Sequence, residues 1–390
     1  MKNKFLIIGL LIAGSLSAFN TVVAQNITGD KYGKGHSLLA QDSSFYLKFE
    51  ARIQTLYSGV RNQETHMYKD QILIRRSRLK FQGWAYHPRL SYKFELGLSN
   101  RDIASGGIPQ SGNTANIVLD AVVKYNFYKN WSVWMGQTKL PGNIERVISS
   151  ASLQFVDRSN LNSRMNIDRD VGVQLRYKGK SLRYSGAITM GEGRNMTAKN
   201  AGGYDFTNRV EWLPFGDFAS SGDYKAADLK RENDVKLMIG VTYDHNDHAS
   251  RQRGQLGSFL SEQRTLNTWF VDAHLKYRGL STMIEYADKE AVDGSVIRDD
   301  NGNYFESFYV GKAFNSQVGY LFKNNIEVAG RYTEVNPTKE TLMPATKQYT
   351  LGLSKYFVGH KLKVQSDLSW LEEEASADEL MYRFQVEITL

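Results

Sequence analysis

The sequence predicts an all-β protein, a transmembrane antiparallel β-barrel of about sixteen strands with one constriction loop folded inward. Three observations favour this fold class. Segments of about ten residues alternate apolar and polar side chains, as in 381–390, where Tyr382, Phe384 and Val386 share one face. Short turns alternate with long loops, as in outer-membrane barrels. Aromatic residues stand at both ends of the alternating segments, as at the two interfaces of a bilayer.

The N-terminus carries an export pattern. Two lysines in 1–4 precede an apolar run at 5–16, and small residues at 22–24 stand before Gln25. This order is typical of a secretory signal peptide, expected here at 1–24. Residues 25–44 are then an N-terminal lead-in segment, and 45–390 form the barrel domain.

Composition narrows the function classes. The chain has no cysteine, which excludes a lipoprotein anchor, thiol nucleophiles and cysteine metal sites. After the signal, no run of eighteen apolar residues suggests a membrane-spanning helix. Lys and Arg number 49 and Asp and Glu 41, a formal net charge of +8, which is too small an excess to indicate nucleic-acid binding.

The connections between predicted strands come in two lengths. Tight links lie at 87–89, 128–130, 178–180, 278–279, 323–325 and 358–360. Longer connections lie near 59–69, 102–114, 140–168, 192–206, 245–264, 289–305, 336–345 and 373–379. One link breaks the alternation, because 214–233 falls where a short turn is due. The resulting count of about sixteen strands is even, as in bacterial barrels.

If the apolar side chains face lipid, the polar side chains line the lumen. The second strand then places Arg76, Arg78 and Lys80 in a row, and the first strand adds Arg52. Rings of arginine and lysine favour anions. The alternative is a non-selective channel, since a water-filled lumen needs charges of either sign and many of them pair.

The longest connection, 140–168, is the expected constriction. A barrel of about sixteen strands leaves a wide aqueous channel, so a selective channel needs a narrowing element. This loop carries arginines, acids and apolar residues that could anchor it to the wall. The candidates for an anion path, from wall and loop together, are Arg52, Arg76, Arg78, Lys80, Lys139, Arg146, Arg158 and Arg164.

The two ends of this loop resemble the phosphate-selective porin O and P family. The shared residues are Gly136, Gln137, Lys139, Pro141 and Glu145 before the loop, and Arg169, Asp170 and Gly172 after it. The resemblance covers 45–390. It implies a homotrimeric porin of the bacterial outer membrane, surrounded by lipid, inserted by the barrel-assembly machinery and free of cofactors. Its function would be passive diffusion of small anions such as phosphate.

Rival interpretations rest on weaker patterns. Asp244–His248 offers metal-ligand types in what is predicted to be a surface loop, and 299–303 lacks the final acid of a calcium loop. A barrel hydrolase would need an assembled site, but the seven histidines are scattered and no G-x-S-x-G motif is present. We expect no enzyme, no catalytic residue and no metal. A purely structural barrel would have a plugged lumen.

Overall fold

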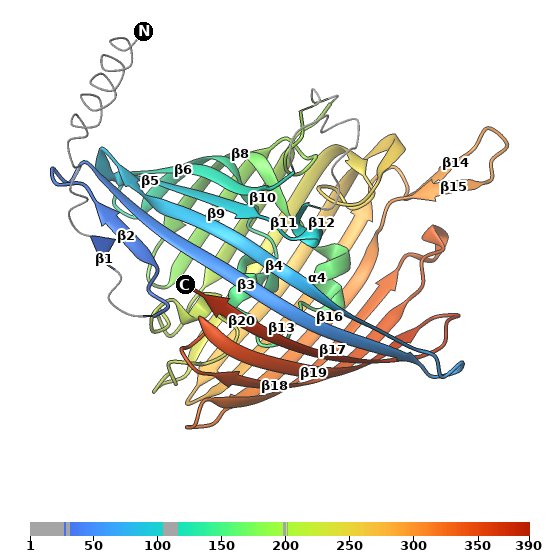
Figure 1. Ribbon diagram of the computed structural model, residues 1–390. Coiled ribbons are helices and arrows are strands. Elements are labelled where there is room, and N and C mark those ends of the chain that lie inside the picture. The colour runs from blue at the N-terminus through green and yellow to red at the C-terminus, as the bar shows by residue number, and fades with distance from the viewer. Residues whose placement is uncertain (1–26, 29–31, 104–115, 198–199, 201) are drawn as a thin grey trace, which may run out of the picture.

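The computed structural model describes residues 27–28, 32–103, 116–197, 200 and 202–390. They form a closed antiparallel β-barrel of 16 strands (Figure 1), so the predicted fold class is confirmed. The expected signal peptide at 1–24 lies outside the described residues. Among the helices of the described residues, none is long and apolar enough to cross a membrane.

Each barrel strand pairs with the next along the chain. The strands are β3 (Phe45–Asn62), β4 (Tyr68–Ala85), β5 (His87–Gly97), β6 (Val118–Tyr128), β7 (Trp131–Lys139), β8 (Arg169–Lys178), β9 (Leu182–Thr189), β10 (Asp205–Trp212), β11 (Lys236–Arg251), β12 (Phe259–Tyr277), β13 (Leu280–Ala291), β16 (Gly311–Leu321), β17 (Ile326–Pro337), β18 (Thr346–Tyr356), β19 (Leu362–Glu373) and β20 (Glu379–Thr389).

Pairing of β20 with β3, from Glu379 opposite Asn62 to Thr389 opposite Arg52, closes the ring. Closure leaves no strand edge exposed to hydrocarbon, where an unpaired amide would have no partner. We call the end of the barrel that carries the tight links the short-turn end, and the opposite end the long-loop end.

Alternating burial along the strands shows which way the side chains point. In β10, Asp205, Thr207, Arg209 and Glu211 are buried, while the side chains between them are exposed. This is the reverse of a soluble sheet, because the polar face is covered inside the barrel and the apolar face lies outside. The predicted assignment of polar residues to the lumen therefore agrees with the structure.

Strand β11 is longer than the sequence pattern predicted. The segment Asp244–His248 was expected in a surface loop, but it lies within β11, which runs to Arg251. Asp244 is consequently buried in the lumen, whereas His245 faces outward and contacts Phe206 and Asn267. The loop prediction for this segment is wrong, because polar side chains continue the strand beyond its apolar part.

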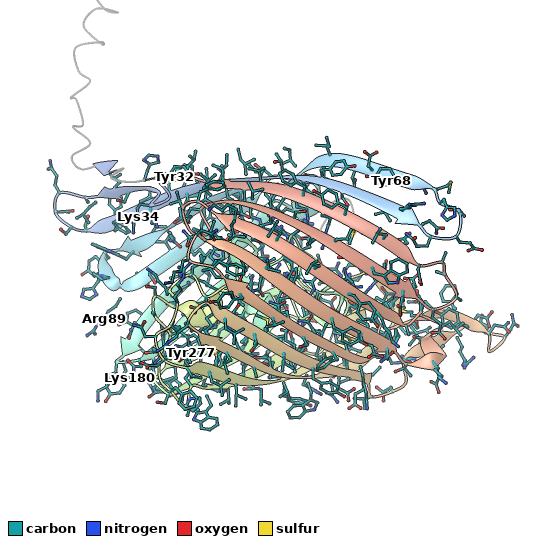
Figure 2. All side chains as sticks on the ribbon, turned by 90° about the horizontal axis from the view of Figure 1, so that it is seen from below. Tyr32, Lys34, Tyr68, Arg89, Lys180 and Tyr277 are labelled. Carbon is teal, nitrogen blue, oxygen red and sulfur yellow. The ribbon has the colours of Figure 1, made fainter. Side chains whose placement is uncertain are left out.

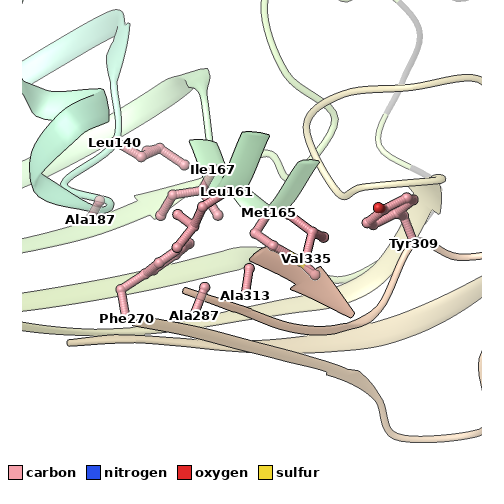
Figure 3. Close-up of a cluster of buried hydrophobic side chains, with 10 residues drawn as sticks. All are labelled: Leu140, Leu161, Met165, Ile167, Ala187, Phe270, Ala287, Tyr309, Ala313 and Val335. Carbon is pink, nitrogen blue, oxygen red and sulfur yellow. The ribbon is translucent and has the colours of Figure 1, made fainter. Parts of the chain in front are cut away.

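The loop 140–168 folds into the lumen. It contains α3 (Ile144–Val147), η2 (Ser150–Ser152) and α4 (Asn160–Met165). Its apolar side chains pack against inward-facing residues of the opposite wall, as Figure 3 shows for Leu161, Met165 and Phe270. This packing buries a hydrophobic core inside a channel and holds the loop on β12, β13, β16 and β17.

The unusual link after β10 also enters the barrel. In 213–235, Leu213 and Phe218 pack with Ile144, Ile148 and Leu153 of the inward loop. The backbone amide of Ala226 donates a hydrogen bond of 2.9 Å to the carbonyl of Ser152. We call 213–235 the inner segment, since it fills the short-turn end of the lumen beneath the inward loop.

Part of the lead-in extends the sheet. β1 (Ile27–Thr28) pairs with β2 (His36–Leu39), and β2 pairs with 46–49 of β3. These residues of β3 lie beyond Arg52, the last partner of β20, so β2 takes over the edge that β20 leaves free. The remaining short elements are α2 (Asn100–Ile103), η3 (Gly222–Tyr224), η4 (Lys339–Thr341) and the hairpin β14 (Val296–Arg298) and β15 (Tyr304–Ser307).

Candidate functional site

An open chamber of about 500 Å³ remains between the inward loop and the wall of β4–β10. Most of its charged side chains are basic. The basic residues are Arg78, Lys93, Lys124, Lys139, Arg146, Arg158, Arg169, Arg176, Lys178, Arg183 and Arg209. The acids are Glu95, Asp120 and Glu211.

Acids elsewhere on the lumen wall explain part of this imbalance. Asp272 accepts a hydrogen bond of 3.2 Å from the Ile144 amide, and Asp367 accepts one of 3.1 Å from the Val156 amide. Glu327 accepts one of 2.7 Å from the Gln154 side chain. Glu327 and Asp367 hold the inward loop on the wall and do not line the chamber, whereas Asp272 also forms an ion pair with the chamber base Arg209.

Several chamber bases also have no acid partner. Arg78, Lys93, Arg146, Arg169, Arg183 and Arg209 each form an ion pair. Among the residues that the structure describes, no carboxylate oxygen lies within 4.0 Å of the charged nitrogens of the remaining bases. We call these five the unpaired bases: Lys124, Lys139, Arg158, Arg176 and Lys178.

Two of the unpaired bases flank one tryptophan. The Nζ of Lys124 lies 3.8 Å from the Trp134 ring centroid, and the guanidinium of Arg176 lies 4.0 Å from it. Arg176 also donates to Gln174 Oε1 at 2.7 Å. The ring therefore holds two like charges at the chamber wall through cation–π contacts.

Two other unpaired bases shape the inward loop. Lys139 Nζ donates to the carbonyl of Arg146 at 2.7 Å and to that of Ile148 at 3.2 Å. Arg158 Nη2 donates to the same Ile148 carbonyl at 2.8 Å. The carbonyls are neutral acceptors, so they add no compensating negative charge beside the two bases.

The predicted anion-path candidates do not all meet in the chamber. Arg78, Lys139, Arg146 and Arg158 line it. Arg52 instead binds Ser150 Oγ at 2.8 Å, and Lys80 pairs with Glu50. Arg76 pairs with Asp157 at 2.9 Å. Arg164 is exposed on α4, 5.8 Å from the Tyr309 ring centroid.

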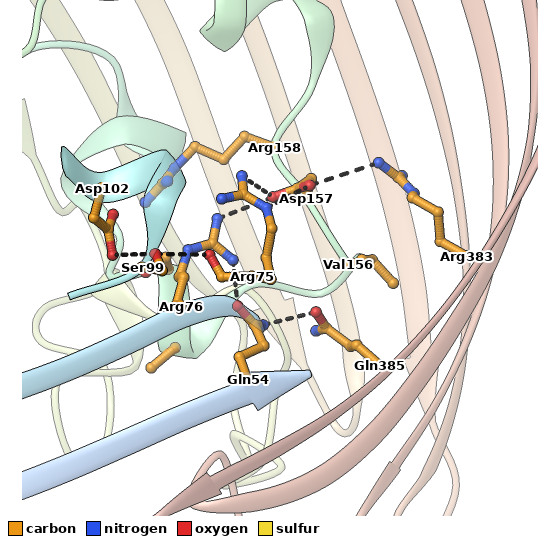
Figure 4. A network of polar contacts seen from close by, with 12 residues as sticks. Gln54, Arg75, Arg76, Ser99, Asp102, Val156, Asp157, Arg158, Arg383 and Gln385 are labelled. Carbon is orange, nitrogen blue, oxygen red and sulfur yellow. Dashed lines mark hydrogen bonds and ion pairs between the residues drawn. The ribbon is translucent and has the colours of Figure 1, made fainter. Parts of the chain in front are cut away.

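A network around Asp157 ties the tip of the inward loop to the wall (Figure 4). Its carboxylate lies 2.8 Å from Arg75, 2.9 Å from Arg76 and 3.9 Å from Arg383. Arg75 and Arg76 are consecutive, yet both reach Asp157, because a β-bulge at Arg75 interrupts the pairing of β4 with β3. Strict alternation therefore missed Arg75.

The residues on which the family resemblance was based lie at the two ends of the inward loop. Gly136 has φ +126°, and a Cβ there would lie 2.2 Å from the Ala121 carbonyl oxygen. A Cβ on Gly172 would lie 2.2 Å from the Ile188 carbonyl oxygen. Both positions therefore bring the backbones of neighbouring strands too close for a side chain.

The polar residues of this set support the loop. Glu145 accepts hydrogen bonds from Ser159, 2.6 Å from its Oγ and 3.0 Å from its amide. Gln137 donates to the Val118 carbonyl at 2.9 Å. Pro141, two residues after Lys139, also lines the chamber.

The remaining two residues of the set lie at the start of β8. Arg169 Nε donates to Asp120 at 3.2 Å, so it belongs to the paired chamber bases. Asp170 accepts a hydrogen bond of 2.8 Å from the Val171 amide.

Sequence reasoning missed four contributions to the chamber. Arg209 in β10 and Lys93 in the middle of β5 occupy inward-facing positions that the alternation could have indicated, whereas Lys178 is the last residue of β8, where the alternation signal fades. Tyr224 comes from the inner segment, whose entry into the lumen no local pattern indicates. The unusual length of this link was the one available signal.

Comparison with known proteins agrees with this architecture. The model of a family described as phosphate-selective porin O and P matches residues 47–381. No curated protein sequence matches the chain.

Several solved structures share the fold. The anion-selective porin from Comamonas acidovorans has a TM-score of 0.55 and 11% identity, over 88% of this chain and 99% of that one. The outer membrane channel DcaP of Acinetobacter baumannii has a TM-score of 0.57 and 12% identity, over 90% and 99%. In-vitro folded OmpT of Vibrio cholerae, in its trimer form, has a TM-score of 0.54 and 10% identity, over 89% and 100%.

Proposed function

Because the chain belongs to the phosphate-selective porin O and P family, we propose that it passes small anions through the basic chamber. It is a channel of the bacterial outer membrane rather than an enzyme, as its family and barrel indicate. The observation that carries the proposal is the set of unpaired bases, Lys124, Lys139, Arg158, Arg176 and Lys178.

The physical basis is the field inside a narrow, low-dielectric opening. Charges there act with little screening, whereas charges on the rim are screened over roughly 8 Å at physiological salt. Glu327 and Asp367 are turned toward the inward loop, and Asp272 compensates only Arg209 among the chamber bases. The open path is therefore bordered by a positive excess, which attracts anions and repels cations.

The solute class follows from the donors. Guanidinium groups match the geometry of phosphate and carboxylate, and lysines add point charges. We therefore propose small oxyanions, phosphate and carboxylates among them, as the solutes. A chamber of about 500 Å³ accommodates these ions with part of their hydration shell.

The proposed assembly is a homotrimer. The similar OmpT structure is described in a trimer form. Most soluble oligomers close symmetrically, and we extend this expectation to the membrane. The mass of the native complex in detergent checks this, and a monomeric mass contradicts it. Insertion by the barrel-assembly machinery stays a prediction from the family resemblance.

Planar-bilayer recording in a salt gradient tests the selectivity. We expect a zero-current potential of the anionic sign for the wild-type protein. The double variant Lys124→Gln and Arg176→Gln should move that potential toward the cationic sign, because it removes two unpaired charges from the chamber wall. The control is Lys69→Gln with Lys347→Gln, two exposed lysines at the long-loop end.

The control variant removes the same charge and should leave the potential within error of the wild type. Equal shifts in both variants contradict a selective chamber. A wild-type potential near zero favours the second candidate, a general non-selective porin. The observation that supports this candidate is the extensive pairing of lumen charges.

A further inference from the structure

Exposed cations lie around the barrel at its short-turn end. Lys129, Lys180, Arg278 and Lys323 come from four different connections between strands, and Arg89 lies at the start of β5. We call these residues the cationic girdle. Figure 2 shows Arg89 and Lys180 at the same end as Tyr277, with Tyr68 at the opposite end. In an outer-membrane barrel, the short turns face the periplasm.

The girdle is not neutralised by the protein. Among the described residues, none of its members has a carboxylate oxygen within 4.0 Å. The exposed acids of the described chain at this end are Asp42, Asp217 and Asp234, and Asp217 already pairs with Arg183 at 2.7 Å. The charges are therefore free for an external partner.

Aromatic neighbours set the depth of these charges. Lys129 Nζ lies 5.1 Å from the Tyr128 ring centroid, and the Arg278 guanidinium lies 5.0 Å from that of Tyr277. Phe322 precedes Lys323 and is exposed. Outward aromatic rings mark the level of the lipid headgroups, so cations stacked on them lie at the same level.

The opposite end lacks this pattern. Its exposed charges have both signs. They include Glu64, Asp293, Glu340 and Glu374 as well as Lys69 and Lys347. The cationic girdle is thus a property of the periplasmic end, and the net charge of the chain does not explain it.

We propose that the cationic girdle binds anionic phospholipid headgroups of the periplasmic leaflet. A lipid leaflet lies along the outer wall of the barrel, and the five cations lie at the short-turn end of that wall, on four connections and the start of β5. An acidic protein or the cell wall would contact the periplasmic face, and stacking on outward tyrosines would give it no advantage. The proposal depends on the outer-membrane location and is independent of which solute the pore passes.

The test measures lipid preference at the wall. The full protein is reconstituted with phosphatidylcholine, and its tryptophan fluorescence is quenched by brominated phosphatidylglycerol or brominated phosphatidylcholine. Trp212, outward at the short-turn end and 50% exposed, reports on the relevant leaflet. We expect the protein to bind phosphatidylglycerol roughly 3- to 5-fold more strongly than phosphatidylcholine. This is the ratio of affinities expected when about one cation lies near each anionic lipid.

Substitution of all five girdle residues by glutamine should bring this preference close to unity. The matched control changes five exposed bases at the long-loop end to glutamine and should keep the wild-type lipid preference. These bases are Lys69, Arg298, Lys312, Lys339 and Lys347. If the five-residue variant does not fold, Lys129→Gln with Arg278→Gln should still lower the preference at least twofold.

Three results overturn the proposal. The first is a wild-type protein without preference for the anionic lipid. The second is an equal loss in the girdle variant and its control, which would indicate an effect of net charge alone. The third is a girdle variant that no longer co-sediments with purified peptidoglycan but keeps the wild-type lipid preference. That result would assign the cations to the cell wall.

Discussion

Arg75 donates two hydrogen bonds to Asp157, of 2.8 Å from Nη2 and 3.2 Å from Nε, and so joins β4 to the tip of the inward loop. Arg76 adds a third hydrogen bond of 2.9 Å to the same carboxylate. One carboxylate therefore ties the tip of the inward loop to two arginines of β4. This contact exists because a β-bulge turns two consecutive arginines to one side of the strand.

Asp157→Asn should weaken the attachment of the inward loop. Breaking a buried ion pair leaves a charge uncompensated, and here the substitution exposes Arg75 and Arg76 to mutual repulsion. We expect a loss of about 3 kcal/mol in the free energy of unfolding, together with noisier single-channel currents. Denaturant titration and bilayer recording check this. Asp234→Asn, an exposed acid at the short-turn end, should change neither.

The pKa of Asp157 determines the pH range in which the inward loop stays attached to β4. Burial raises the pKa of Asp157, but the guanidiniums of Arg75, Arg76 and Arg383 outweigh burial and hold it well below its usual range. A carboxyl with a lowered pKa in the folded state contributes stability that is present above its unfolded pKa of about 3.9 and is lost as the pH falls through the folded value. Current noise should therefore stay constant from pH 8 to pH 5, and a rise near pH 6 would contradict this.

Truncation of Phe218 in the inner segment should increase the single-channel conductance. Phe218 is 4% exposed and packs in the cluster that joins the inner segment to the inward loop, whereas Phe215 is 54% exposed. Phe218→Ala should remove about 3 kcal/mol of packing and let the inner segment move, which widens the path. Single-channel conductance should rise for Phe218→Ala and stay unchanged for Phe215→Ala. Equal conductances would show that the inner segment does not border the path.

Gly136→Ala should impair assembly of the barrel. The residue has φ +126°, and its new Cβ would lie 2.2 Å from the carbonyl oxygen of Ala121 on β6. We expect a reduced fraction of the heat-modifiable folded form in the outer membrane. Gly330→Ala serves as the control, because nothing lies within 4 Å of a Cβ there. Normal yields of both variants would contradict the steric argument.

The sequence alone determined the barrel, because each strand is specified locally. Polar and apolar side chains alternate along β10 and β20 whatever their neighbours are, and lipid outside with water inside converts that alternation into two faces. The lengths of the connections then indicated which ends of the strands carry short turns and which carry long loops. The same local pattern placed Arg52 and Arg78 in the lumen, and both lie there.

Only the tertiary structure decided which lumen charges border an open path. The alternation shows that Asp272 and Arg176 face inward, but not that Asp272 turns to the inward loop while Arg176 stacks on Trp134 in the chamber. The alternation also did not indicate the bulge at Arg75 or the entry of Phe218 into the lumen. These outcomes depend on packing between residues far apart in the chain, such as Ile144 with Phe218, and no local periodicity records such contacts.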